Sequence, residues 1–208
     1  MKNEECQAIV LSTQDYGDTD RIVSLFTLEH GRLKGFAKSA RASRKRFGGL
    51  LEPGNRLAVS LTLKPEGLSR LERVEPFPGA GSPRERLESL ALALYGCELV
   101  ELLTPEGQPY PRLFRLLCAL LEHLAANLAS LEDRRFFEIN LLNILGYRPP
   151  LEDEHLRPLQ NCLRTGKFRG TTLPEETMLH GGRLLDAAIA GHAARPLKSL
   201  GFLDDLLR

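Results

Sequence analysis

The sequence lacks the segments that mark membrane-spanning and secreted proteins. It contains no run of about 18 apolar residues, which excludes a transmembrane helix on length. The N-terminus is polar from Lys2 to Glu5 and has no apolar core of the kind found in secretory signals. We therefore expect a cytoplasmic protein that does not enter a membrane.

Cysteine is scarce and scattered. The four cysteines of the 208-residue chain form no CxxC pair, so neither a disulfide framework nor a four-cysteine zinc site is predicted. Cys97 and Cys118 fall among leucines at helical spacing and are predicted to be buried. His155 and Cys162 could in principle ligate a metal, but no second pair stands near them at ligand spacing, so we predict no metal site.

Sequence motifs of the common enzyme classes are also missing. The chain has no GxxxxGK[ST], no GxGxxG after a strand, no HExxH and no GxSxG. Asp15, Asp18 and Asp20 lie around a glycine, but the spacing of a calcium loop is absent, so we interpret them as turn-forming residues. We predict no enzymatic activity and no cofactor.

Positive charge, in contrast, is concentrated in one stretch. The formal net charge is only +1, yet residues 1–80 hold 13 basic and 10 acidic residues. Seven of the basic residues lie between Arg32 and Arg46, and no acid occurs between Glu29 and Glu52. We refer to residues 32–46 as the basic segment. A localised positive patch is typical of a protein that binds a phosphate backbone, although such runs also occur in solvated loops, and composition does not separate the two.

The first 76 residues have the pattern of short β-strands separated by turns. Strands are expected over residues 6–12, 20–28, 31–40, 56–63 and 68–74, and a turn over 13–19. Five short strands with turn signals indicate a small barrel, and no stretch among them is helical enough to connect parallel strands.

The third of these strands places cations and an aromatic ring together. The period of two puts Arg32, Lys34, Phe36 and Lys38 on one face of the strand. The loop that follows adds further cations, and Phe47 either stacks on bases or anchors the loop. A small barrel that binds single strands needs such a combination of cations and aromatic rings. The candidate DNA-binding residues are Arg32, Lys34, Phe36, Lys38, Arg41, Arg44, Lys45 and Arg46.

The remainder of the chain is predicted to be mostly helical. After a proline- and glycine-rich segment at 76–82, Ser82 and Glu85 have the spacing of a capping box, which predicts a helix start. Leucine-rich stripes predict core-forming helices over residues that begin at 87, at 113 and, with Ser130 as N-cap, near 131. Residues 147–171 lose this periodicity and are predicted to be irregular. Thr172 is predicted to cap a further helix that runs toward Ala193, and residues 200–207 have a helical pattern.

Several stretches of the chain resemble one bacterial family. Residues 18–29 (DTDRIVSLFTLE), 37–41 (AKSAR), 46–49 (RFGG) and 51–53 (LEP) resemble the N-terminal domain of the DNA repair and recombination protein RecO family. Further along the chain, FFEINLL, LGY and RPLKS, which begin at 136, 145 and 195, resemble the helical half of the same family. The motifs span nearly the whole chain, and their combination and order are specific.

The resemblance implies an α+β fold. An N-terminal five-stranded OB-fold β-barrel, residues 1–80, is followed by an α-helical domain, residues 81–208, with an irregular excursion at 147–171. Many members of the family carry four cysteines in this excursion that bind a structural zinc. Only Cys162 remains there in this chain, so the metal is not carried over.

The resemblance also implies a function without catalysis. Proteins of this family are recombination mediators in DNA repair: they bind single- and double-stranded DNA and anneal complementary strands. They also bind the acidic C-terminal tail of single-strand-binding protein, and they act with RecR to load RecA on coated strands. Such a protein would be cytoplasmic and associated with the nucleoid. The basic segment matches the DNA-binding face of the family.

Two residues near the C-terminus are candidates for binding a protein partner. Arg195 and Lys198 lie in the RPLKS motif, and either could bind a carboxylate-rich peptide. An alternative hypothesis is therefore an adaptor whose helical domain mainly binds proteins, with DNA binding secondary.

Overall fold

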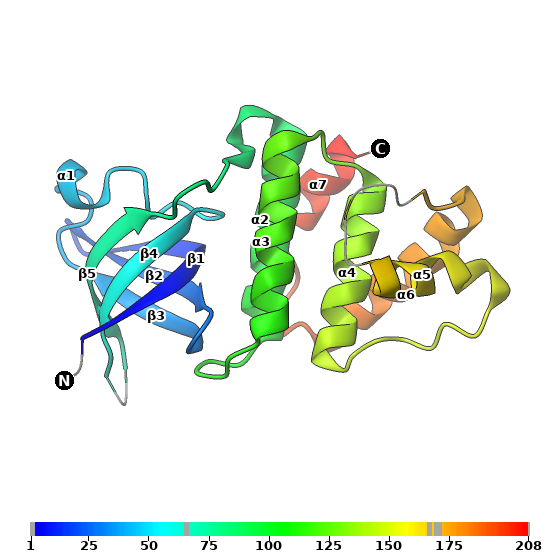
Figure 1. Ribbon diagram of the computed structural model, residues 1–208, viewed down its shortest axis with the longest axis horizontal. Helices are drawn as coiled ribbons and strands as arrows, with labels where there is room; N and C mark the ends of the chain where they lie inside the picture. Colours follow the sequence, from blue (N-terminus) through cyan, green and yellow to red (C-terminus); the bar gives the residue numbers. More distant parts are fainter. Residues whose placement is uncertain (1–2, 65–66, 166–167, 169–171, 208) are drawn as a thin grey trace.

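The chain forms a β-barrel followed by a group of packed helices. A computed structural model describes residues 3–64, 67–165, 168 and 172–207, and for Arg44 and Lys45 the backbone alone. Figure 1 shows the barrel at one end of the molecule, α2 and α3 beside it, and the remaining helices beyond. The predicted α+β fold, a five-stranded OB-type barrel followed by helices, is confirmed. In the described part of the chain, no helix is long and apolar enough to span a bilayer.

The barrel consists of five strands that close on themselves. They are β1 (Asn3–Tyr16), β2 (Asp20–Thr27), β3 (Gly31–Ala37), β4 (Arg56–Thr62) and β5 (Ser69–Pro76), arranged in the order β1-β2-β3-β5-β4. Neighbouring strands are antiparallel except β3 and β5, which pair in parallel through Gly35 with Ser69 and Phe36 with Arg70. Alternating residues such as Val23, Leu25, Leu57, Val59 and Leu61 fill the interior.

The C-terminal ends of two strands differ from the prediction by three residues or more. β1 continues to Tyr16, because its pairing with β2 extends as far as the Tyr16–Asp20 pair, so residues 13–16 are strand rather than turn. β3 ends at Ala37 rather than at residue 40, because Ser39 adopts a left-handed backbone conformation (φ 56°). The Ser39 amide donates to the Asp20 carboxylate. Lys38 therefore lies in a turn just beyond the strand.

The loop after β3 is anchored by an aromatic residue. A short helix, α1 (Arg44–Phe47), ends with Phe47 buried beside Leu51 in the barrel core. Of the two roles considered for Phe47, the structure supports the anchor.

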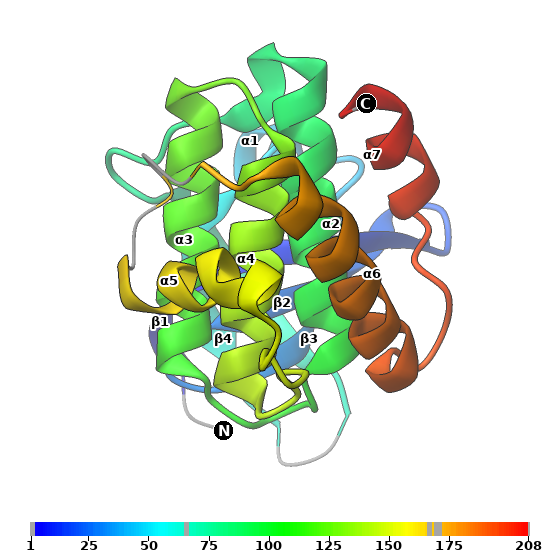
Figure 2. The ribbon, with the colours of Figure 1, turned by 90° about the vertical axis from the view of Figure 1, so that its right-hand side faces the viewer.

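Six helices follow the barrel in the described part of the chain. They are α2 (Leu87–Leu103), α3 (Pro111–Ala126), α4 (Leu131–Leu145), α5 (Arg157–Thr165), α6 (Glu175–His192) and α7 (Leu200–Leu206). Helix α2 is buried on nearly all sides, because it packs against the barrel, α3, α4 and α7. Figure 2 shows α4, α5 and α6 in front of this helix. Cys97 and Cys118 are buried, as predicted.

The helix starts were predicted with mixed success. The predicted N-cap of α4 at Ser130 is confirmed, and Asp133 completes a capping box there. The helix ends at Gly146, which has a φ of 80°. The capping box predicted at Ser82 is wrong. Only a 3-10 turn (Pro83–Glu85) forms there, because Arg86 has an extended backbone, and α2 begins at Leu87.

The segment at 147–171 is more regular than its sequence indicated. It contains a 3-10 turn (Glu154–Leu156) and helix α5, whose Leu159 and Cys162 are buried. Residues 166–167 and 169–171 of this segment lie outside the described residues. Helix α6 begins at Glu175 with Pro174 at the N-cap, so the predicted cap at Thr172 is wrong.

A second apolar core, outside the barrel interior, joins the barrel to the helices. Ile9, Leu11 and Phe26 point out of the barrel and are buried among residues of α2 and α3. The loop between α2 and α3 adds a second attachment, because the Gly107 amide donates to the Arg32 carbonyl (2.8 Å). Gly31 has a φ of 68°, and a Cβ atom there would lie 1.9 Å from the Gln108 carbonyl oxygen, so only glycine fits. The helical part is thus fixed against one half of the outer face of the barrel.

Candidate nucleic-acid interface

The other half of that outer face is open to solvent and carries two aromatic rings. Strand register places Gln14, Ile22, Phe36 and Arg70 side by side across β1, β2, β3 and β5. Tyr16, at the end of β1, is 56% exposed, and its ring meets that of Phe36 edge to face with centroids 5.9 Å apart. We refer to Tyr16, Ile22, Phe36 and Arg70 as the aromatic face. Rings of this kind offer bases an apolar surface for stacking.

Cations of the basic segment lie beside the aromatic face. Lys34 and Lys38 precede and follow Phe36, and both are exposed. Arg41 is also exposed and donates to the Asp18 carbonyl (3.2 Å). Arg46 donates to the Glu72 carbonyl (3.3 Å) and lies over the Phe47 ring, 4.7 Å from its centroid. The side chains of Arg44 and Lys45, which were predicted to bind DNA, lie outside the described residues.

The fold brings acids to a segment that has none of its own. Lys34 lies 3.4 Å from the Glu106 carboxylate of the α2–α3 loop, and Arg41 lies 3.6 Å from Asp15 of β1. Lys38 forms no ion pair or hydrogen bond within the described part of the chain. Of the described cations in the basic segment, Lys38 is therefore the one whose side chain is available without breaking an existing contact.

Arg32 has contacts of a different kind. Its side chain donates to the Thr104 carbonyl (3.0 Å) and to the Glu106 carboxylate (3.1 Å), and it is largely buried. These contacts tie β3 to the α2–α3 loop. The assignment of Arg32 to DNA stays a prediction, but the structure gives this side chain a role in docking the two parts of the chain.

Two residues of the aromatic face were missed by the sequence reasoning. Tyr16 was assigned to a turn, because the polar residues around it hid the end of β1. Arg70 lies beside Phe36 only through the parallel pairing of β3 and β5, which no local pattern indicates. Neither residue had a clear local signal, because residues 12–15 are all polar and show no alternation that would extend β1 to Tyr16.

A large groove runs between the barrel and the helices. It has a volume of about 950 Å³ and is lined by β1, β3, α2 and the chain from 194 to 202. The groove brings together Arg32 and Lys34 of the basic segment with Arg195 and Lys198, the two residues predicted to bind a protein partner. Residues from opposite ends of the sequence therefore share one surface.

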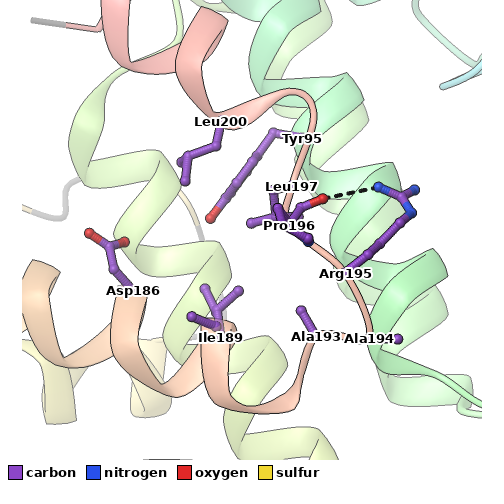
Figure 3. Close-up of a pocket in the computed structure, with 10 residues that line it drawn as sticks. Tyr95, Asp186, Ile189, Ala193, Ala194, Arg195, Pro196, Leu197 and Leu200 are labelled. Carbon is purple, nitrogen blue, oxygen red and sulfur yellow. Dashed lines mark hydrogen bonds between the residues drawn. The ribbon is translucent and has the colours of Figure 1, made fainter.

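A second, more apolar pocket lies wholly in the helical part. It has a volume of about 450 Å³ and lies between α2, α6 and the start of α7. Its walls are mainly Tyr95, Ile189, Ala193, Pro196, Leu197 and Leu200, with Asp186 and Arg195 as the charged residues (Figure 3). Arg195 lines both the pocket and the groove, whereas Lys198 lines the groove alone.

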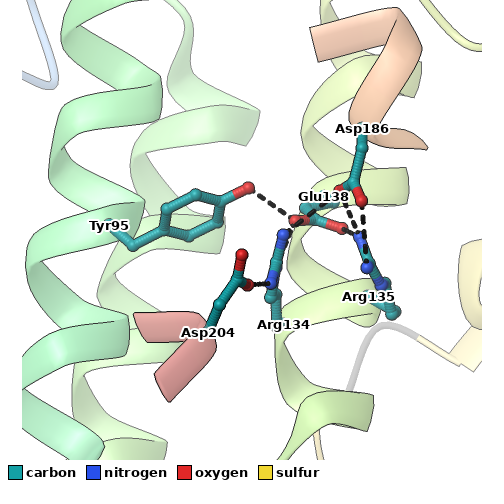
Figure 4. A network of polar contacts seen from close by, with 6 residues as sticks. All are labelled: Tyr95, Arg134, Arg135, Glu138, Asp186 and Asp204. Atoms are coloured by element: carbon teal, nitrogen blue, oxygen red, sulfur yellow. Dashed lines mark hydrogen bonds and ion pairs between the residues drawn. The ribbon is translucent and has the colours of Figure 1, made fainter. Parts of the chain in front are cut away.

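A buried polar network lies next to this pocket. Glu138 of α4 is fully buried and accepts hydrogen bonds from Tyr95 (2.5 Å), Arg134 (2.8 Å) and Arg135 (2.7 Å), as Figure 4 shows. The two arginines also bind Asp186 of α6, and Arg134 binds Asp204 of α7. Burial, together with the Glu138 carboxylate, raises the pKa of Tyr95 well above its ordinary value, so Tyr95 remains the donor. The network joins α2, α4, α6 and α7.

Glu98 of α2 holds the segment between α6 and α7. Its carboxylate accepts from Arg195 (2.7 Å), from the amides of Lys198 and Ser199, and from the Ser199 hydroxyl (2.7 Å). Partial burial would by itself raise the pKa of Glu98, but the hydrogen bonds from Ser199, Lys198 and Arg195 outweigh it and lower the pKa to about 2. The wall shared by pocket and groove is therefore fixed by one ionised side chain.

Within the described residues, no three histidine, cysteine, aspartate or glutamate side chains are grouped to hold a metal ion. His155 pairs with Glu176 (3.0 Å), and the Cys162 thiol is buried and donates to the Pro158 carbonyl. No chemistry that depends on a metal is derived from these residues.

Comparisons with known proteins agree on one family. Residues 1–79 match the family model "Recombination protein O N terminal", and residues 84–157 match "Recombination protein O C terminal". Similar proteins include the DNA repair protein RecO of Pelobacter propionicus, 47% identical over 241 aligned positions, and that of Geobacter sulfurreducens, 44% identical over 237. These alignments cover 98% and 97% of this chain and 97% of each relative. Both are longer than the chain's 208 residues, so these relatives carry residues that this chain lacks.

Removal of the Glu138 carboxylate should destabilise the helical part strongly. In Glu138→Ala two buried guanidinium groups lose their shared partner, and we expect a loss of about 3–5 kcal/mol in the free energy of unfolding, measured by urea denaturation. Glu132→Ala, in the first turn of the same helix, is the control and should cost less than about 1 kcal/mol. Equal effects of the two substitutions would show that the network does not stabilise the fold.

The low pKa of Glu98 predicts a specific acid response. Because the folded pKa of about 2 lies below the ordinary value of 4.5, the carboxylate contributes stability that is fully present above pH 4.5 and is lost as the pH falls toward 2. The difference in unfolding free energy between the wild type and Glu98→Gln should therefore shrink over that range. Urea denaturation at a series of pH values measures it. A Glu98→Gln difference that does not change with pH would contradict the assignment.

Proposed function

The chain belongs to the RecO family of DNA repair proteins, and from this premise we propose that it is a recombination mediator. In this proposal it binds single- and double-stranded DNA, anneals complementary strands, and helps to load RecA on strands coated by single-strand-binding protein. The activity is binding and strand pairing, with no covalent step.

The observation that carries the proposal is the composition of the open barrel face. Two aromatic rings, Tyr16 and Phe36, lie in contact there and are surrounded by Lys34, Lys38 and Arg70. Phosphates attract the cations and release counterions, and bases stack on the rings, so one surface contacts both parts of a nucleotide. The contacts in this proposal are made to phosphates and to the faces of bases rather than to base edges, so we expect little sequence preference.

Strand annealing follows from the same electrostatics. Two complementary strands repel each other through their phosphates, and a cationic surface that holds both lowers this repulsion. Arg41 and Arg46 extend the positive charge beyond the aromatic face, over the end of the barrel where the α1 loop lies. The protein then supplies proximity, and the bases supply the pairing.

The apolar pocket of the helical part is our candidate site for the acidic tail of single-strand-binding protein. Its apolar walls suit hydrophobic side chains, and Arg195 at its edge suits a carboxylate (Figure 3). Arg195 is already paired with Glu98, so a tail carboxylate would share this guanidinium. Lys198 does not line the pocket, so its assignment as a tail-binding residue has less support than that of Arg195. RecR is proposed as a further partner on the basis of the family alone.

The pocket also favours the second candidate, an adaptor that binds mainly proteins. The more apolar of the two cavities lies in the helical part, and no cation of the barrel lines it. Separate measurements of DNA and peptide affinity distinguish the two candidates. A protein that binds the tail peptide but not DNA at about 100 mM salt, where phosphate contacts still contribute, would be the adaptor.

DNA binding should depend on the aromatic face and on Lys38. Tyr16→Ala removes one stacking ring, and we expect about tenfold weaker binding of oligo(dT), measured by fluorescence anisotropy. Lys38→Glu should weaken binding further and should make the slope of log affinity against log salt less steep by at least ~0.7. Annealing of complementary oligonucleotides should slow in both variants.

Arg112→Glu is the matched control for the charge reversal. Arg112 is exposed on α3 and forms no ion pair in the part of the chain that the structure describes, so its reversal changes net charge equally at a distant place. If Arg112→Glu weakens DNA binding as much as Lys38→Glu, net charge rather than the barrel face governs the affinity, and the site assignment is wrong.

Peptide binding should depend on Arg195. A synthetic C-terminal tail of single-strand-binding protein, titrated by calorimetry, should bind Arg195→Ala about tenfold more weakly, because a charge-assisted hydrogen bond is lost. Arg183→Ala, an exposed arginine on α6, should bind the tail like the wild type. Unchanged binding by Arg195→Ala would place the tail elsewhere on the protein.

A further inference from the structure

We propose that the groove between the barrel and the helices holds a single strand of DNA that continues from the aromatic face. In this assignment Phe202 stacks on a base and Lys198 contacts a phosphate. The inference rests on the proposed DNA-binding function, and it adds a second binding segment that lies on the C-terminal helices.

The aromatic face and the groove are continuous. Gln14 and Lys34 line the groove, and Gln14 also stands in the row that contains Phe36. Lys34 precedes Phe36 by two residues on β3, a separation of roughly 7 Å along a strand. A DNA strand that leaves the ring of Phe36 therefore reaches the groove within about one nucleotide.

The cations of the groove favour an anionic occupant. Four cations line it, Arg32, Lys34, Arg195 and Lys198, against the two carboxylates Glu98 and Glu101. Glu98 binds Arg195 and Ser199, and Glu101 accepts from the Ser12 hydroxyl (2.6 Å). Arg32 and Lys34 both pair with Glu106 of the α2–α3 loop. Lys198 is exposed, and its ammonium group has no ion pair within the described residues. It is the groove counterpart of Lys38 on the barrel.

Phe202 gives the groove an aromatic surface. Its side chain is 48% exposed, and it lines the groove together with Leu94 and Leu102 of α2. An exposed phenylalanine beside cations matches the arrangement on the aromatic face, where rings and cations also alternate. The repetition of this combination favours DNA over a peptide as the occupant.

Phe202 is also held in place by its surroundings. Its neighbour Leu203 is fully buried, and Asp204 binds Arg134 of the buried network. The helix start is fixed by Ser199, which binds Glu98. The ring is therefore presented from a positioned helix, which lowers the entropic cost of stacking.

Tryptophan fluorescence gives a direct test, because the chain contains no tryptophan. Phe202→Trp introduces a single reporter in the groove, and Leu179→Trp introduces one on α6, where Leu179 is 53% exposed and does not line the groove. Both variants are titrated with oligo(dT) of about 20 nucleotides, longer than the ~4–16 that one OB barrel covers. Anisotropy of a labelled oligonucleotide follows total binding in the same samples. We expect quenching of Phe202→Trp and none of Leu179→Trp.

Affinity measurements give a second readout. Phe202→Ala should weaken binding of the ~20-nucleotide strand about tenfold and of a ~6-nucleotide strand less than about twofold, because the short strand is held by the barrel. Lys198→Ala should reduce the salt slope for the long strand by ~0.7, and Arg183→Ala should leave it unchanged.

The outcomes separate this inference from the proposed function. If the wild type binds oligo(dT) but Phe202→Trp is not quenched, the groove is not the path and the barrel proposal stands. If the wild type does not bind oligo(dT) even at low salt, both are overturned. If the tail peptide rather than DNA quenches Phe202→Trp, the groove is a protein-binding surface and the inference is wrong.

Discussion

The outer face of β1, β2 and β3 is divided between the helices and the solvent, and the arrangement of every candidate site depends on this division. Ile9, Leu11 and Phe26 are buried under α2 and α3, whereas on the same face Tyr16 is exposed and Phe36 is half-buried. Burial of apolar surface stabilises the folded state by about 25 cal/mol per Å², and this free energy keeps the first group covered. The groove lies where the covered half ends, so a packing interaction sets the border of the binding surface.

The surface formed by the aromatic face and the basic segment is less positive than its sequence alone indicates. Glu106 of the α2–α3 loop pairs with Lys34, and Asp15 of β1 pairs with Arg41. Glu72 pairs with Arg70 on the same strand, β5. Such exposed pairs contribute little to stability, and they are readily exchanged for contacts with phosphates. In the proposed function, these acids would moderate the affinity for DNA and ease the release of strands after pairing.

Local periodicity was enough to predict the barrel, the main helices and the cap of α4, because each depends on residues close in sequence. It was not enough where distant segments meet. The pairing of Arg70 with Phe36 comes from barrel closure, the contact of Arg32 with Thr104 comes from docking, and the shared groove of Lys34 and Lys198 comes from both. The extended backbone at Arg86, which delays α2, has no signature that the capping-box pattern could reveal.

The segment at 76–82, rich in proline and glycine, has the composition of a flexible linker, yet the barrel and helices are joined at more than this one place. The α2–α3 loop hydrogen-bonds to Arg32 and covers Gly31, Arg56 of β4 pairs with Glu122 of α3, and Arg84 reaches the Pro53 carbonyl. A body attached at several separated points cannot rotate about one of them without breaking the others. The two parts therefore move as a single unit, and in the proposed annealing reaction the strands would be brought together by diffusion of the DNA rather than by closure of the protein.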